Sequence, residues 1–246
     1  MMSFEPSPFE PGYRRVASAI AARILNRTLR EGDVLPPESE LAEQFAVNRS
    51  TIREALRELE SADLVSRRRG TKRMVVSHPR TDQIAGRVGQ SLALNDVTAR
   101  EVWETLELIE PPIAAAAAER ADAAAIGLLR ASVAGYAADH QDAKQAVAGV
   151  ADFFRAVAAA SGNRVLTITQ EPLLLLLTAA LEVMIDVATP ARARIAAAQQ
   201  KMLAAIVAGD SATAREWMAK HVRDFRRGFE ISGIDLESAV PVPDRD

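Results

Sequence analysis

Hydrophobic positions in the first eighty residues follow two different periods. Three segments place apolar residues three or four positions apart, as on one face of a helix, and two short apolar runs follow them. Pro36-Pro37 is typical of a helix start, and Asn48 is a typical N-cap before the third segment. The pattern therefore predicts three helices and a two-stranded hairpin, over residues 13–29, 38–45, 49–62, 64–65 and 74–76.

Beyond residue 81 the helical period continues, but the composition changes. This part is rich in Ala and Leu and has few clusters of β-branched residues. Asp122 and Asp210 are candidate helix caps, and Pro172 is expected to kink or split the helix that contains it. Long helices joined by short turns are typical of an antiparallel bundle. Turn-forming residues separate six predicted helices, over 99–120, 123–139, 142–160, 165–188, 190–208 and 211–229.

Basic residues are concentrated in the first part of the chain, although the chain as a whole is acidic. The formal net charge of the 246 residues is −3, yet residues 1–80 carry 14 Lys and Arg against 11 Asp and Glu. Residues 49–73 alone hold eight basic and four acidic side chains. A local basic cluster in an acidic chain is typical of a surface that binds a polyanion, and the alternative interpretation is an ordinary solvated helix face.

The third predicted helix and the hairpin after it have the order of a winged helix-turn-helix. Polar and basic residues occupy the first turn of that helix, which is the end that reaches base edges in the major groove. Arg67-Arg68-Arg69 lies at the tip of the hairpin, where arginines can contact phosphates or enter a narrow minor groove. The order and spacing of these elements predict a DNA-binding domain.

A change of composition near residues 77–81, where His78-Pro79 interrupts any regular element, predicts a domain boundary. The predicted fold class is mostly α, an N-terminal winged helix-turn-helix followed by an antiparallel all-α helical bundle. The expected organisation is a DNA-binding domain over 1–78, a linker over 79–94, a helical domain over 95–232 and a loose tail over 233–246.

The run from Leu35 to Leu59, LPPESELAEQFAVNRSTIREALREL, with Leu64-Val65 and the Arg-Gly hairpin tip, resembles the DNA-binding domain of GntR-type transcriptional regulators. The resemblance implies a homodimer that binds a short palindromic operator in double-stranded DNA. Ser39 stands where many members have an arginine that touches the operator, so one contact is expected to differ. The implied DNA contacts are Ser39, Arg49, Ser50, Thr51, Arg53, Arg69, Gly70 and Thr71.

Three segments of the second half, 104–121, 153–163 and 205–222, resemble the FCD effector domain of the FadR group within the same family. The resemblance implies dimerisation and a small-molecule effector inside the bundle, which many members hold through a divalent metal bound by one Asp and three His. An arginine that commonly faces the effector falls here on Leu106. The four metal-binding positions fall on Val150, Phe154, Gln199 and His221.

Two of these four positions offer no metal ligand, because the side chains of Val150 and Phe154 have no lone pair. We therefore expect no metal and no other cofactor. The same positions predict an apolar wall of Leu106, Val150 and Phe154, with Gln199 and His221 as the polar groups, which favours an acyl or aromatic effector. Two alternatives stay open: a DNA-binding dimer without an effector, whose bundle core is closed, and a metal-dependent carboxylate sensor whose site survives in altered form.

Composition also limits the function classes. The chain has no Cys and three His, and it has neither a nucleophile motif nor a phosphate-binding glycine loop, so an enzyme is not expected. The N-terminus lacks the basic start and apolar run of a signal peptide, and the longest apolar run, 173–181, is too short to span a membrane. We therefore expect a cytoplasmic, ligand-responsive repressor that does not contact membranes.

Overall fold

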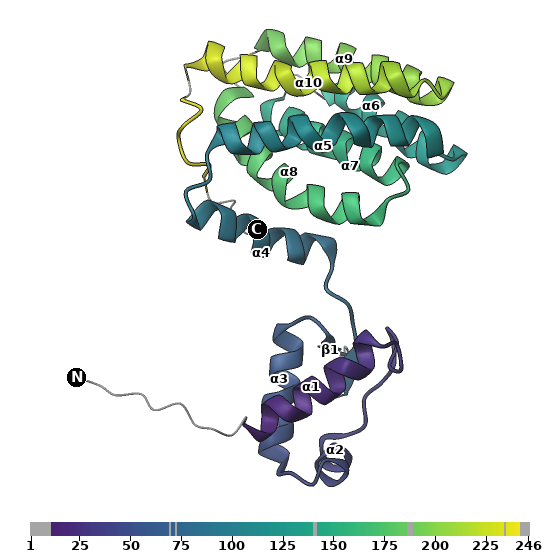
Figure 1. Ribbon diagram of the computed structural model, residues 1–246, viewed down its shortest axis with the longest axis vertical. Helices are drawn as coiled ribbons and strands as arrows, with labels where there is room; N and C mark the ends of the chain where they lie inside the picture. The colour runs from purple at the N-terminus through teal and green to yellow at the C-terminus, as the bar shows by residue number, and fades with distance from the viewer. Residues whose placement is uncertain are drawn as a thin grey trace, which may run out of the picture. The chain divides into compact units, whose positions relative to one another are not determined.

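The structure, a computed structural model, describes residues 11–68, 70–71, 73–139, 142–185, 189–233 and 235–241 (Figure 1). The chain divides into two compact units, Met1–Arg80 and Thr81–Asp246. A separate cluster of buried hydrophobic residues lies within each unit. Each unit therefore has the core of its own that is expected of an independent domain.

The first unit consists of three helices and a hairpin, in the order that the hydrophobic pattern predicts. The elements are α1 Gly12–Leu25, α2 Glu38–Gln44, α3 Arg49–Ser61, β1 Val65–Arg67 and β2 Met74–Val76. The two strands are antiparallel, with Val65 opposite Val76, and residues 32–35 hydrogen-bond to the other edge of β2. One face of each helix is buried in a common core, which includes Val16, Ile20, Ile24, Leu41, Ile52, Leu56 and Leu59.

Helix α1 ends at Leu25, four residues before the predicted end. Arg27 has a φ of 63°, in the left-handed region that interrupts a helix. The Asn26 side chain accepts a hydrogen bond of 3.0 Å from the backbone N–H of Thr28, and such local bonds compete with the helix. Leu29 still packs against the core from the turn, which explains why its apolar character extended the predicted helix.

A short turn at residues 45–47 joins α2 to α3. Ala46 has a φ of 52°, which is uncommon for a residue with a Cβ, and the N–H of Val47 donates a hydrogen bond of 3.0 Å to the carbonyl of Ala42. Asn48 occupies the N-cap position of α3, although its side chain makes no capping hydrogen bond. The turn thus fixes Arg49 as the first residue of α3.

The second unit consists of seven helices among its described residues. Helix α10 lies along α5 and α9, α7 packs between α6 and α8, and α4 packs on α8 (Figure 1). The predicted fold class, a winged helix-turn-helix followed by a helical bundle, is confirmed. The helices are α4 Thr81–Leu94, α5 Ala99–Arg120, α6 Ala123–Asp139, α7 Ala143–Ala160, α8 Arg164–Ile185, α9 Thr189–Ala208 and α10 Ser211–Ser232.

Side-chain caps fix several of these helix starts. Asp122 and Asp210 each accept a hydrogen bond from a backbone N–H three residues later, at 2.8 and 3.0 Å, as their positions predict. Thr98 and Glu101 form a reciprocal capping box at the start of α5. Helix α5 therefore begins at a defined residue, which matters because the C-terminal segment docks there.

Residues 79–94, which the sequence assigns to a linker, instead contain helix α4. Ala85, Gly89 and Ala93 are buried on this helix, and a Cβ on Gly89 would lie 3.8 Å from the side chain of Leu175 on α8. Small residues allow the two helices to approach closely. The larger apolar residues Ile84, Val88 and Leu92 do recur at helical spacing, but they are half-buried or exposed, and the packing against α8 is made by the small residues.

The tail, which is expected to be loose from residue 233, packs against the start of α5 over its described residues 235–241. Three backbone hydrogen bonds of 2.9–3.3 Å join it to residues 97–100. Val240 is buried, with 4% of its surface exposed. The hydrogen bonds join the N–H groups of Ala99, Arg100 and Val240 to the carbonyl groups of Ser238, Leu236 and Val97.

Helix α8 contains Pro172 and is not split into two helices by it. Its segment Arg164–Glu182 is long and apolar enough to cross a membrane by length and composition. Leu174, Leu176 and Leu181 are fully buried in the core of the second unit. Packing inside the bundle therefore accounts for the apolar run.

Gly149 on α7 allows the ring of Tyr136 on α6 to approach closely. A Cβ on Gly149 would lie 2.9 Å from Cδ2 of Tyr136, and this ring is buried. We expect Gly149→Ala to lower the free energy of unfolding by about 1–3 kcal/mol, measured by urea denaturation. The matched control is Gly127→Ala on α6, where a Cβ meets nothing within 4 Å. It should raise the stability by about 0.5–1 kcal/mol, and equal effects of the two variants would contradict the packing role of Gly149.

Candidate nucleic-acid interface and effector site

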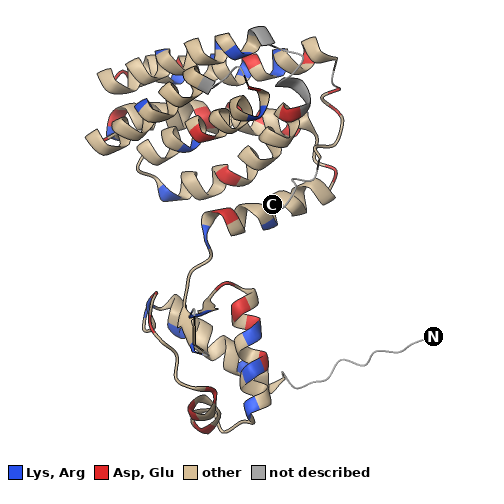
Figure 2. Ribbon diagram, turned by 180° about the vertical axis from the view of Figure 1, so that it is seen from behind, with Lys and Arg blue, Asp and Glu red and all other residues tan. Residues whose placement is uncertain are grey.

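Helix α3 buries one face and exposes its arginines on the other. Ile52, Leu56 and Leu59 lie inside the first unit, whereas the side chain of Arg53 is 63% exposed. Basic and acidic segments alternate along the outside of this helix (Figure 2). The residues implied as DNA contacts in its first two turns are exposed at Arg49, Ser50 and Arg53, and half-buried at Thr51. The structure thus places these four residues together at the N-terminal end of α3.

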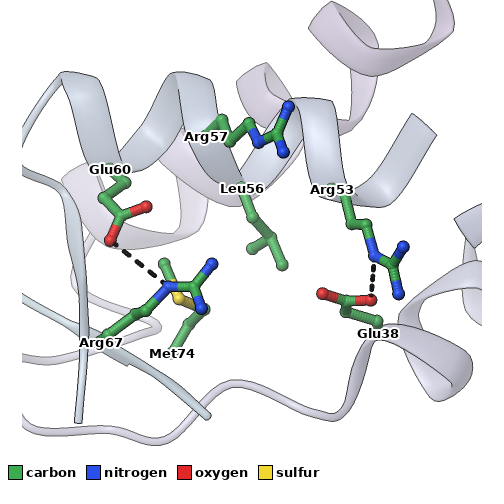
Figure 3. A pocket seen from close by; sticks show the side chains of 7 residues that line it. All are labelled: Glu38, Arg53, Leu56, Arg57, Glu60, Arg67 and Met74. Atoms are coloured by element: carbon green, nitrogen blue, oxygen red, sulfur yellow. Dashed lines mark hydrogen bonds and ion pairs between the residues drawn. The ribbon is translucent and has the colours of Figure 1, made fainter. Parts of the chain in front are cut away.

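An open hollow separates the outer face of α3 from α2 and the hairpin (Figure 3). Its volume is about 300 Å³. A neighbouring hollow of about 280 Å³ brings Ser39, Arg49, Arg53 and Arg73 together. The first hollow is lined by both acidic and basic side chains from α2, α3, β1 and β2. Its lining residues are Glu38, Arg53, Leu56, Arg57, Glu60, Arg67 and Met74.

Two of these arginines form ion pairs with acidic side chains. Nε of Arg53 donates a hydrogen bond of 2.7 Å to the carboxylate of Glu38 on α2, and Nε of Arg67 lies 3.9 Å from Glu60 on α3 (Figure 3). The groups are partly exposed, so such pairs contribute little to stability. The effect of the shorter pair is to restrict the direction of the Arg53 guanidinium.

Sequence reasoning did not single out Glu38, Glu60 or Arg57 as site residues. Glu38 and Arg53 are 15 positions apart on different helices, so no local spacing rule connects them. Arg57 lines the first hollow one helical turn after Arg53 and forms no ion pair with the described part of the chain. The sequence could have indicated Arg57, because it lies one helical turn after Arg53 on the same face of α3.

The backbone turns tightly at the tip of the β1–β2 hairpin, at the residues predicted to form the wing. Gly70 has a φ of 77°, a left-handed conformation that glycine adopts without a steric penalty. The N–H of Thr71 donates to the carbonyl of Arg68 at 3.1 Å, and the Thr71 hydroxyl accepts from the N–H of Arg73. Gly70 and Thr71 are exposed turn residues. The predicted contact Arg69 lies outside the described residues.

All five positions predicted for the effector site are buried in the second unit. Leu106 is 1% exposed, and Val150, Phe154, Gln199 and His221 are 0% exposed. The imidazole of His221 is surrounded by aromatic rings, with centroid distances of 6.1, 5.5 and 4.8 Å to Phe153, Phe154 and Phe225. An aromatic cluster therefore surrounds the one histidine retained at a metal-binding position.

The polar groups of this core have no partners among the described residues. Neither ring nitrogen of His221 and neither amide atom of Gln199 makes a hydrogen bond. Burial lowers the pKa of His221 to about 3, so the ring is neutral at physiological pH. Buried polar groups without partners are costly, and a ligand that supplied hydrogen bonds would satisfy them.

The residues present do not fit a divalent metal. Within the described residues no group of three or more His, Cys, Asp or Glu side chains is arranged to hold one. The Phe154 ring stacks on His221 with an interplanar angle of 20°, which puts hydrocarbon beside the only histidine of the set. A neutral imidazole and one amide make a weaker donor set than known metal sites use.

The apolar cavity lined by Leu106 is nearly filled. Its volume is about 10 Å³, the space of roughly one water molecule. Phe225, which contacts His221, also lines it. Of the five predicted effector positions only Leu106 lines this cavity, and all five side chains are shielded from solvent.

A second buried polar pair lies beside this core and was not anticipated from the sequence. The Gln170 amide of α8 donates hydrogen bonds of 2.8 and 3.0 Å to the carboxyl of Glu110 on α5. Burial raises the pKa of Glu110 to about 8, against the lowering effect of this hydrogen bond. Next to this pair, Arg155 bridges Asp152 and Glu171 through ion pairs of 3.1 and 2.6 Å.

These two units define the class of protein. A winged helix-turn-helix that exposes arginines on its third helix is a DNA-binding module. The second unit is an all-α bundle whose core contains unsatisfied polar groups. The chain is thus a winged helix-turn-helix DNA-binding protein with a helical second domain.

Comparison with known proteins assigns the family. The profile of the gntR family of bacterial regulatory proteins matches residues 12–75, and the FCD domain profile matches residues 101–224, half of the chain. The chain belongs to the GntR family and carries an FCD domain. It is a DNA-binding transcriptional regulator with an effector-binding domain and not an enzyme, as the sequence led us to expect.

Individual relatives agree with this family. The chain is 30% identical to the galactonate operon transcriptional repressor of Escherichia coli (strain K12) over 131 residues, which are 52% of this chain and 57% of the repressor. It is 35% identical over 81 residues to an uncharacterized HTH-type transcriptional regulator of Mycobacterium tuberculosis, 31% of this chain and 34% of that protein. The matches thus span about a third to somewhat over half of these relatives.

A solved structure resembles the chain over more of its length. The GntR protein of Streptococcus agalactiae has a TM-score of 0.63 and 26% sequence identity, and the match covers 87% of this chain and 99% of that one. Both units are therefore included in the similarity.

Glu38 is expected to affect the selectivity of DNA binding through its bond to Arg53. We expect Glu38→Gln to raise non-specific DNA affinity, because one negative charge leaves the surface around the basic end of α3. The ratio of specific to non-specific affinity should fall about tenfold, because the Arg53 guanidinium loses its partner. Fluorescence anisotropy with operator and random duplexes measures both quantities.

Glu40→Gln is the matched control for this variant. Glu40 lies on the same helix and bonds to Gln44, not to Arg53. It should raise non-specific affinity to a similar extent and leave the specificity ratio unchanged. A specificity ratio that falls equally in both variants would show that charge alone, and not the position of Arg53, is responsible.

Glu110 should make stability depend on pH in an unusual direction. Its folded pKa of about 8 exceeds its ordinary value of 4.5, so the folded protein binds more protons than the unfolded one between these values. Stability therefore falls as the pH rises through this window. His221, whose folded pKa is about 3, has the opposite effect, but only below its ordinary value of 6.5.

Between pH 6.5 and 8 Glu110 dominates, because the opposite effect of His221 fades within about one pH unit above 6.5. We expect the free energy of unfolding to fall by up to about 2 kcal/mol over this range, measured by urea denaturation at each pH. Glu110→Gln, which keeps a neutral side chain of similar size, should remove the fall. A variant with the same pH dependence as the native chain would assign the effect to another group.

Proposed function

We propose that this protein is a homodimeric repressor that binds a palindromic operator and responds to a small molecule. The observation that carries the DNA-binding part is the exposed basic end of α3 beside a Gly70 hairpin turn. In a winged helix-turn-helix, the N-terminal residues of the recognition helix contact base edges. Two copies on a two-fold axis read two half-sites.

Individual contacts follow from these positions. Arg49, Ser50, Thr51 and Arg53 read bases or phosphates from the start of α3. Ser39 makes a shorter contact than the arginine found at its position in many relatives. The hairpin residues Arg69, Gly70 and Thr71 approach the phosphates or the minor groove.

The proposed effector is a largely apolar molecule of acyl or aromatic character. Leu106, Val150 and Phe154 supply hydrocarbon, and the partnerless groups of Gln199 and His221 supply hydrogen bonds. A few polar groups in a largely apolar site are typical of small-molecule pockets. Binding without a metal separates this site from the metal-dependent sites of many relatives.

A second candidate is a DNA-binding dimer that takes no effector. The observation in its favour is the small volume, about 10 Å³, of the apolar cavity beside Leu106. In that case the second unit serves dimerisation alone. Operator affinity would then be insensitive to small molecules.

The proposed domain organisation and location are those of a two-domain transcriptional regulator. The DNA-binding domain comprises residues 1–78, and residues 95–232 form the effector-binding and dimerisation domain, to which α4 and the segment 235–241 are added by their packing. The protein works in the cytoplasm, where its operator is.

Arg53→Ala tests the recognition helix. An operator can be selected from a pool of random duplexes, and its affinity measured by anisotropy at several salt concentrations. We expect the loss of Arg53 to cost about 1–3 kcal/mol of binding free energy and to reduce the salt dependence. Lys201→Ala, an exposed charge on α9, is the matched control and should change neither quantity. An unaltered operator affinity in Arg53→Ala would exclude the proposed recognition helix.

Metal removal tests the effector site. We expect chelation with EDTA to leave the melting temperature and operator affinity unchanged, and titration with Zn²⁺ and a simple sugar acid to give no tight calorimetric isotherm. The triple variant Val150→Asp, Phe154→His, Gln199→His restores four ligands and is the positive control. Tight binding by the native chain that disappears with chelator would favour the metal-dependent carboxylate sensor.

A further inference from the structure

An apolar groove lies at one end of the bundle, between α5, α8 and α10. It is the cavity of about 10 Å³ that Leu106 lines. None of its lining residues is charged, and the one side-chain N–H among them, Nε1 of Trp103, donates to the carbonyl of Val222 at 3.1 Å. The lining residues are Ala99, Val102, Trp103, Leu106, Leu177, Ala180, Phe225, Phe229 and Val240.

Val240 differs from the other lining residues because it does not belong to a helix of the bundle. It comes from the C-terminal segment 235–241, which follows α10 along the end of the bundle to the start of α5 (Figure 1). Residues 235–241 thus form a strap across the end of the bundle. The strap inserts one branched aliphatic side chain, 4% exposed, into the groove.

The attachment of the strap is polar and partly solvent-exposed. Three backbone hydrogen bonds join it to residues 97–100, and the Arg100 guanidinium forms an ion pair of 2.5 Å with Glu237. Arg100 and Glu237 are 43% and 58% exposed, so this pair is screened by solvent. Val240 is the deeply buried apolar side chain of the strap, and Leu236 is packed more loosely. A segment held in this way opens at a lower free energy than the helices beneath it.

We propose that the groove is a binding site for an uncharged, hydrocarbon-rich small molecule, and that Val240 of the strap occupies the site when this molecule is absent. The proposal rests on the proposed effector response, moves its site to this groove, which shares only Leu106 with the predicted effector positions, and specifies its regulation. The strap leaves when the ligand enters, because both use the same apolar walls. Val240 shows by its own position that the groove accepts a branched aliphatic group.

The groove selects an uncharged ligand. A carboxylate or an ammonium group placed among its lining residues has no opposite charge and no hydrogen-bond donor to pair with, and burying such a group is costly. The inner wall reaches polar atoms at one point: Phe225 contacts the ring of His221 at 4.8 Å, and both nitrogens of that ring lack partners. A ligand with one hydroxyl or carbonyl group at its inner end suits this arrangement.

The test uses the neutral dye N-phenyl-1-naphthylamine, whose fluorescence rises in apolar surroundings. The chain has two tryptophans, so in a Trp217→Phe background Trp103 is the sole tryptophan. The efficiency of energy transfer from Trp103, which lines the groove, then reports how close the dye lies to it, and a dye in the groove should quench Trp103 almost completely. The binding constant is measured for the full-length chain and for two strap variants in this background.

Val240→Asp should drive the strap out of the groove, because a carboxylate does not stay in an apolar site. Glu237→Gln weakens its attachment and leaves the groove wall unchanged. We expect the dissociation constant of the dye to fall at least tenfold in Val240→Asp and two- to fivefold in Glu237→Gln, with almost complete quenching of Trp103 by the bound dye in both. Val207→Asp places the same charge at a 41% exposed valine of α9 and should bind the dye like the parent chain.

Either of two results overturns the proposal. One is a dissociation constant that stays within twofold of the parent in both strap variants, which would make the strap a purely structural element. The other is a gain of binding that leaves Trp103 far from fully quenched, which would place the dye elsewhere. Circular dichroism establishes that each variant is folded, and if Val240→Asp is not, Glu237→Gln decides the question.

Operator binding separates this proposal from the proposed function. If the dye enters the groove as expected but leaves operator affinity unchanged, the strap and groove are correct and the effector response is wrong. If an effector alters operator affinity in the native chain while the strap variants bind the dye no better, the regulator is correct and the strap is not its switch.

Discussion

The burial of one side of α3 is the constraint on which the DNA-binding unit depends. Ile52, Leu56 and Leu59 must face α1 and the hairpin to form a core, and a helix that buries this face has to expose the opposite one. The arginines of α3 therefore point outward because of packing, before any DNA is present. This small unit has a single core, so the burial of the hydrophobic face of α3 alone decides where the basic face points.

Polar contacts then refine what packing has placed. Glu38 reaches across from α2 and bonds to Arg53, although both groups are partly exposed and the pair adds little to stability. Such a contact acts on direction more than on energy. In the second unit polar groups affect energy more than direction. Glu110, Gln199 and His221 are completely buried, and a buried polar group is costly unless it has a hydrogen-bond partner, and costlier still if it is charged.

Much of the fold could be predicted from the sequence, because strong periodicity and turn residues mark most helices. Helices α5 and α6 have the predicted bounds, and Asp122 and Asp210 cap as expected. Helix α4 was missed although Ile84, Val88 and Leu92 recur at helical spacing; its buried positions are small residues, which do not reveal the face that packs on α8. The docking of the C-terminal segment was missed because it depends on Val240, Leu236, backbone groups and an ion pair between residues 137 positions apart, which no local pattern reveals.

The candidate sites could also be predicted only in part. The basic turn of α3 and the buried positions around His221 could be named from the sequence, since a motif or a family position marks each, and their roles stay predictions. The pairs Glu38–Arg53 and Glu110–Gln170 join residues 15 and 60 positions apart, and only the fold brings them together. Whether the core is open depends on how side chains fill space, which a list of residue types does not determine.

The turn before α3 has a consequence for the evolution of the recognition helix. Ala46 adopts a left-handed conformation that costs an L-residue roughly 1–2 kcal/mol and that glycine would adopt freely. Glycine would also give the unfolded chain more conformations and loosen the joint between the two helices. Alanine at this position exchanges some stability for stiffness, so the joint before the recognition helix is stiffer than a glycine would leave it.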